Sequence, residues 1–168
     1  DAGVAELERL GFRPTFDPSV FERGDMVAGP PDLRARAIVD AVGRQDVDAL
    51  IAVRGGYCSV EILPHLDART FRATPKALIG YSDLTSLHAW LNGHVGIASV
   101  HGAMLEGRLS NGEVDYDRAS FLGSLSAEPL GELTANTLEA LRPGTADGPL
   151  VGGTLTQLVA SLGTPYCF

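Results

Sequence analysis

The first third of the chain alternates between apolar residues at helical spacing and short breaks rich in proline and glycine. In residues 2–10 the apolar positions recur every three or four residues before a glycine, which predicts a helix with a glycine stop. The same spacing predicts a helix over 32–42, which starts after two prolines and ends before Gly43. The FRPTF segment at 12–16 is a strand candidate.

Three continuous apolar runs follow, at 49–53, 76–80 and 96–100. Strands that are covered on both faces read as unbroken apolar runs, so these segments are predicted to be parallel strands of one sheet. Helices are predicted between them near 58–66 and 83–92. This alternation predicts an α/β fold with an open, mostly parallel sheet and helices on both faces, as in flavodoxin-like domains.

The pattern is weaker after residue 101. A helix is predicted over 115–125, short strands over 129–133 and 137–141, and a glycine-led helix over 152–163. No internal boundary is visible, so residues 1–168 are predicted to form one domain, incomplete at its N-terminal strand and truncated before a C-terminal domain. We therefore expect an exposed apolar face where the missing parts would pack.

Composition argues against several classes of function and site. The net charge is −8 with only 13 Lys and Arg, and no basic run is present, which argues against nucleic-acid binding. No apolar run reaches the ~18–20 residues of a membrane span. Cys58 and Cys167 are far apart and lack metal-binding spacing, so a reducing compartment, no disulfide framework and no zinc site are expected.

The strongest chemical candidate is Ser82 in the IGYSDLTSLH segment, between a predicted strand and a predicted helix. A hydroxyl there would lie at the carboxyl end of a parallel strand, where open α/β folds place their sites. The free amides at the helix start could stabilise an oxyanion. The turn is not a G-x-S-x-G elbow, since Leu84 replaces the second glycine. From the local pattern alone, a helix cap by Ser82 or Asp83 is favoured over a nucleophile.

A Gly-Gly turn, Gly55–Gly56, follows the run at 49–53. Two glycines allow a sharp turn and a close approach to a ligand, and adjacent strands would bring this turn to Ser82. The turn matches no nucleotide-binding motif. Arg54 could hold a substrate carboxylate or form a structural ion pair.

Four histidines show no metal-binding spacing: His65, His88, His94 and His101. His88 is predicted to point away from Ser82, whereas His101 ends a strand and could face the site, although a structural role is favoured for it. No local Ser/His/Asp set can be assembled.

Five blocks together resemble the LD-carboxypeptidase family, also called murein tetrapeptide carboxypeptidases, which includes the microcin C self-immunity peptidases. The blocks are AELERLGF, AVRGGY with ILPHLD, KALIGYSDLTSLH, SVHGAML and GPLVGGTLTQLVASLGTPY, in the family's order from residue 5 to 166. Two positions depart from the pattern: Cys58 replaces a glycine and Thr154 replaces an asparagine.

The resemblance implies a serine peptidase that removes a terminal D-amino acid from murein tetrapeptide during peptidoglycan recycling. It implies Ser82 as nucleophile and an oxyanion hole from the backbone N–H of Asp83 and of Gly56 or Gly55. Arg54, Tyr57 and His101 are the candidate substrate contacts. It also implies a cytoplasmic homodimer that needs no cofactor or metal. The triad Glu and His belong to the family's C-terminal half, beyond this chain.

Three alternatives stay open. The chain could be an α/β binding module that no longer hydrolyses its ligand. It could act on a peptidyl-nucleotide of the microcin C type instead of murein peptide. It could also be an unrelated α/β enzyme with its base among His88, His94 and His101.

Overall fold

The computed structural model describes residues 2–24, 27–126, 128–129, 131–132 and 139–168. A three-stranded sheet in the order β1-β2-β3 is formed by β1 (Ala49–Ile51), β2 (Ala77–Gly80) and β3 (Val100–His101). Both strand pairs are parallel, with Ile51 and Val100 each opposite Ile79 of β2. The predicted parallel arrangement is confirmed.

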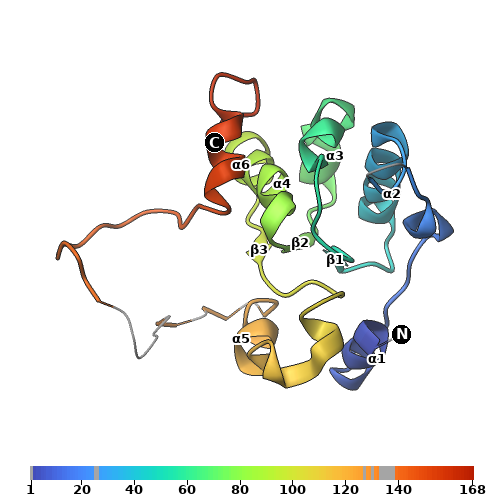
Figure 1. The fold of residues 1–168 in the computed structure, drawn as a ribbon, viewed down its shortest axis with the longest axis horizontal. Coiled ribbons are helices and arrows are strands. Elements are labelled where there is room, and N and C mark those ends of the chain that lie inside the picture. The colour runs from blue at the N-terminus through green and yellow to red at the C-terminus, as the bar shows by residue number, and fades with distance from the viewer. Residues whose placement is uncertain (1, 25–26, 127, 130, 133–138) are drawn as a thin grey trace.

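Helices cover both faces of this sheet (Figure 1). One side holds α2 (Pro31–Gly43), α3 (Ala68–Ala73), α4 (Thr85–Trp90) and α6 (Leu155–Ser161), and the other holds α1 (Ala2–Arg9) and α5 (Arg118–Gly123). Single 3₁₀ turns or short 3₁₀ helices connect these elements: η1 (Pro18–Phe21), η2 (Ser59–His65), η3 (Ser82–Leu84) and η5 (Leu109–Val114).

Alternation along β2 builds a separate apolar core on each face of the sheet. Leu78 packs in the larger core with Phe71 of α3 and Trp90 of α4, whose rings meet edge to face at a centroid distance of 5.0 Å. Ile79 points the other way and packs with α1, η5 and Phe121 of α5. Consecutive strand residues face opposite sides, so one apolar run supplies both cores.

The helices predicted around the central strand are composite. The segment near 58–66 is the 3₁₀ helix η2, which contains Pro64, and α3 is a separate helix that was not predicted. Proline cannot donate a backbone hydrogen bond, which favours a short helix at that point. The segment 83–92 begins with η3, continues as α4 and ends as a π-helical turn, η4 (Leu91–Val95).

Two strand predictions need correction. Residues 12–16 form no strand, because Pro14 lacks the amide that a ladder would need. The third strand covers only Val100–His101, because Gly96 ends the π turn with a φ of 79° and the backbone N–H of Ile97 donates to Leu91 O, which keeps this stretch at the helix end. The strands expected at 129–133 and 137–141 lie largely outside the described residues.

Exposed apolar side chains gather on α6 and the chain just before it. Leu155, Val159 and Leu162 are each more than half exposed, as are Leu150 and Val151. Leu155 and Val159 are four residues apart, so they share one face of the helix. These side chains give α6 and the chain before it an exposed apolar face.

Candidate active site

The site is built where β2 ends and η3 begins. Gly80 is the last strand residue, and a Cβ atom there would lie 2.9 Å from Leu84 Cγ and 3.3 Å from Ala52 Cβ. A contact of 2.9 Å would force Leu84 or the strand end to shift, so glycine allows the first helical turn to pack directly against the strand end. Ser82 stands between them, at the carboxyl end of β2 as the sequence predicts.

The backbone of Ser82 is left-handed, with φ of 62°. This conformation is unfavourable for a residue with a Cβ and is typical of functional turns. The N-cap positions of η3 and α4 are Tyr81 and Leu84, and neither makes a side-chain capping bond. Within the described residues the Ser82 hydroxyl forms no hydrogen bond, so the geometry gives no support to the capping interpretation.

The glycine turn lies against this serine. A Cβ atom on Gly55 would lie 3.3 Å from Ser82 Cβ and 3.5 Å from Ser82 Oγ, so the glycine turn lies directly against the serine. The two segments open onto a cavity of about 350 Å³, here called the serine pocket. It is lined by Arg54, Gly55, Gly56, Tyr81, Ser82, Met104 and Glu106.

Asp83 is fixed by contacts from two distant segments. Its Oδ2 accepts a 2.9 Å hydrogen bond from the Ser59 amide, and its Oδ1 accepts a 3.0 Å bond from Gln157 Nε2. The Ser59 hydroxyl also donates to the Asp83 carbonyl. Burial raises the pKa of the Asp83 carboxyl, and the hydrogen bonds from Ser59 oppose that shift. The residue that follows the serine is therefore held in one conformation.

The substrate-contact candidates fall in different places. Arg54 lines the serine pocket, but its guanidinium lies 3.7 Å from Glu106 in an exposed ion pair. Tyr57 is 71% exposed and does not line the pocket. His101 lines a neighbouring hollow, with its ring centroid 6.2 Å from that of Tyr81. Met104 and Glu106 also line the serine pocket and were not predicted from the sequence.

The histidines do not complete a triad with Ser82 in the described part of the chain. His88 is buried, with Nε2 2.9 Å from Gly80 O and Nδ1 2.8 Å from Ser99 Oγ. Since a carbonyl only accepts, Nε2 carries the proton, and burial lowers the pKa of this imidazole. His88 is thus a structural link between α4 and β2. His94 contacts Cys167 O at 3.3 Å.

The described residues contain no group of three or more His, Cys, Asp or Glu side chains arranged to hold a metal. None of their helices has the length and apolar character needed to cross a membrane.

Comparison with known proteins places this geometry in a family. The model of the LD-carboxypeptidase N-terminal domain matches residues 1–102. A probable murein peptide carboxypeptidase of Bacillus subtilis is 30% identical over 99% of this chain and 53% of its own length. The microcin C7 self-immunity protein of Escherichia coli is 27% identical over 98% of this chain and 56% of its own length.

A solved structure agrees with these relatives. The muramoyltetrapeptide carboxypeptidase of Oxalobacter formigenes is 26% identical, with a TM-score of 0.81, over 99% of this chain and 55% of that protein. The chain therefore spans about half the length of the relatives it matches. With a family model that matches more than half of its residues, this chain belongs to the LD-carboxypeptidase family.

Proposed function

We propose that this chain is the nucleophile-bearing α/β half of a serine peptidase that hydrolyses the L,D-peptide bond to the terminal D-amino acid of murein tetrapeptide. The observation that carries the proposal is the left-handed backbone of Ser82 packed against Gly55 at the mouth of the serine pocket. A strained serine at a strand–helix turn is the geometry that exposes a nucleophilic hydroxyl. The cellular role we assign is cytoplasmic peptidoglycan recycling, by a homodimer.

In this proposal Ser82 Oγ attacks the scissile carbonyl and forms an acyl-enzyme, and the D-amino acid leaves with the proton that a general acid delivers. The backbone N–H of Asp83 and that of Gly56 or Gly55 donate to the oxyanion. The amides at a helix start lack intrahelical acceptors, and Ser59 and Gln157 fix the Asp83 turn. Water then hydrolyses the ester.

The general base comes, in this proposal, from a Glu and a His outside residues 1–168. The relatives are about twice as long as this chain, and the exposed apolar face of α6 offers a surface for further protein to cover. Positioned base catalysis contributes roughly 10²–10⁴-fold, so the segment alone is expected to hydrolyse its substrate poorly.

The test uses the complete protein that carries this segment and measures D-alanine release from murein tetrapeptide. Ser82→Ala should reduce kcat by roughly 10³-fold or more while the far-UV spectrum stays unchanged. Ser120→Ala, on the exposed side of α5, is the matched control. A capping serine would be replaced well by aspartate, so full activity of Ser82→Asp would overturn the nucleophile assignment.

Two further measurements on the complete protein, tetrapeptide binding and cleavage of a peptidyl-nucleotide, separate two of the alternatives. A binding module would retain affinity for the tetrapeptide and release no D-alanine in any variant. An enzyme of the microcin type would instead cleave a peptidyl-nucleotide and leave the tetrapeptide intact.

A further inference from the structure

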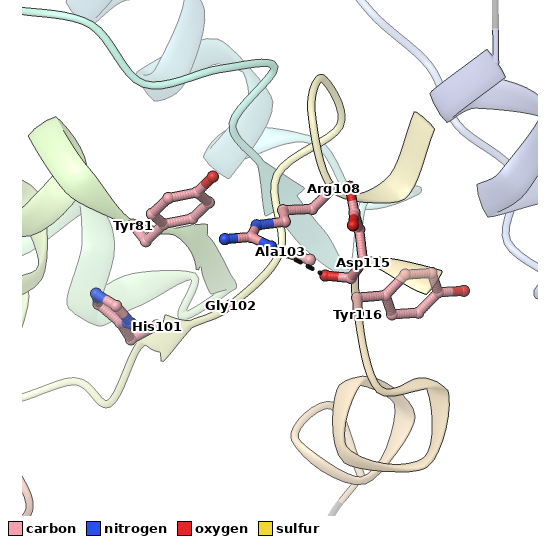
Figure 2. Close-up of a pocket in the computed structure, with 7 residues that line it drawn as sticks. All are labelled: Tyr81, His101, Gly102, Ala103, Arg108, Asp115 and Tyr116. Carbon is pink, nitrogen blue, oxygen red and sulfur yellow. Dashed lines mark hydrogen bonds between the residues drawn. The ribbon is translucent and has the colours of Figure 1, made fainter. Parts of the chain in front are cut away.

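A second hollow adjoins the serine pocket, on the other side of Tyr81. Its volume is about 270 Å³, and we call it the arginine hollow. Figure 2 shows the guanidinium of Arg108 extending across it toward the Tyr81 ring, with His101 on the far wall. Its lining residues are Tyr81, His101, Gly102, Ala103, Arg108, Asp115 and Tyr116. Because Tyr81 immediately precedes Ser82 and lines both cavities, a ligand in the hollow lies beside the proposed nucleophile.

Arg108 uses few of its N–H donors within the described part of the chain. Arg108 Nη1 donates one long hydrogen bond, 3.4 Å, to the backbone carbonyl of Asp115. The Asp115 carboxylate accepts instead from Asn111 Nδ2, and among the described residues no carboxylate pairs with Arg108. Arg54 differs, since its guanidinium lies 3.7 Å from the Glu106 carboxylate. A guanidinium has five N–H donors, and Arg108 uses one of them here in a chain of net charge −8.

Tyr116, which lines the hollow beside Arg108, is held in place by residues of α1. The Tyr116 hydroxyl donates to Glu6 of α1, and Arg9 forms two hydrogen bonds to the same carboxylate. The hydrogen bonds from Arg9 and Tyr116 lower the pKa of Glu6 to about 2, so this carboxylate is ionised at working pH and holds the ring in place. One wall of the hollow is therefore fixed beside the Arg108 guanidinium.

We propose that Arg108 binds a carboxylate of the peptide substrate while the scissile bond lies at Ser82. The inference rests on the proposed peptidase function and adds the group that recognises the substrate. Guanidinium and carboxylate match in planar, bidentate geometry, which gives both affinity and orientation. The carboxylate is either the terminal one, on the leaving D-amino acid, or a side-chain carboxylate further along the peptide.

The test compares three tetrapeptides with the complete protein: the free acid, the C-terminal amide, and a peptide with its side-chain carboxylate amidated. Arg108→Ala should raise the Kd of the free acid roughly 10- to 100-fold, measured by calorimetry in a Ser82→Ala background. One of the two amidated peptides lacks the carboxylate that Arg108 binds. For that peptide, Arg108→Ala should raise the Kd by less than about threefold. Arg108→Lys keeps the charge without the planar guanidinium, so its Kd for the free acid should lie between those of Arg108 and Arg108→Ala.

Arg36→Ala is the charge-matched control, since Arg36 is exposed on α2 and pairs with Asp32. It should leave all three affinities unchanged. The amide that becomes insensitive to Arg108→Ala identifies which carboxylate is bound. Equal loss on all three peptides, or no loss on any, would overturn the proposal. Because the readout is binding, D-alanine release by the Ser82→Ala protein would count against Ser82 as the nucleophile and leave the assignment of Arg108 unaffected.

Discussion

The side-chain amide of Gln157 in α6 donates a 3.0 Å hydrogen bond to Asp83, 74 residues earlier in the chain. The Ser86 hydroxyl donates to Gln157 Oε1 at 3.2 Å, so the amide connects the first turn of α4 with the residue after Ser82. The backbone N–H of Thr154 likewise donates to Thr85 Oγ1. The C-terminal helix thus fixes the turn on which the proposed chemistry depends.

Gln157→Leu should destabilise the protein by about 1–3 kcal/mol, because a buried carboxylate oxygen loses its donor. Urea unfolding followed by far-UV circular dichroism measures the change. Thr156→Ala is the control, since Thr156 is the exposed neighbour on the same helix. Equal stability of the two variants would show that the hydrogen bond to Asp83 contributes nothing.

Asp83 should also impose a pH dependence. Its pKa is raised above the ordinary 3.8, mainly by burial, so the folded state binds this proton more tightly than the unfolded state does. The stability from this group is therefore fully present below pH 3.8 and is lost as the pH rises through the raised pKa.

Asp83→Asn removes this titration. The amide of Gln157 can rotate so that its oxygen accepts from the new side chain, while Oδ1 of Asn accepts from Ser59. The difference in unfolding free energy, variant minus wild type, should become more favourable to the variant as the pH rises from 3 to 7. A difference that is flat or slopes the other way would contradict the burial effect.

The sequence predicted the sheet and the place of Ser82 because both depend on local patterns. Unbroken apolar runs mark covered strands, and Ser82 follows one of them. No local sequence pattern predicts the hydrogen bond between Gln157 and Asp83, because two polar residues 74 positions apart meet only through tertiary packing. The same holds for Arg108 in its hollow. Only the folded structure shows that Gln157 donates to Asp83, and that among the described residues no carboxylate pairs with Arg108.

Cys58 offers a test of backbone strain away from Ser82. Its φ is 72°, at the start of η2, where glycine is favoured. Cys58→Gly should be more stable than Cys58→Ala by about 1 kcal/mol, because both lose the thiol and only glycine relieves the left-handed backbone. Chemical denaturation of the two variants gives the difference directly, and greater stability of the alanine variant would contradict the strain.

Gly80→Ala should destabilise the protein by about 1–3 kcal/mol, since its Cβ would lie 2.9 Å from Leu84 Cγ. Leu84→Ala removes that atom. In a double-mutant cycle the two changes should therefore cost less together than the sum of their separate effects. Strict additivity would show that the contact between strand end and helix start is not what requires glycine.

The decisive prediction concerns Ser82 itself. Ser82→Gly should abolish activity and yet raise the unfolding free energy by about 1 kcal/mol, because glycine adopts φ of 62° without the steric cost that serine pays. Ser82→Ala loses the same hydroxyl but keeps the strain, so it should be as inactive as Ser82→Gly without that gain in stability. Thermal unfolding and D-alanine release are measured on the same complete protein. A position selected for helix capping would behave in the opposite way, with both variants less stable than serine and still active. Loss of activity together with a gain in stability identifies a residue that is kept strained for its chemistry.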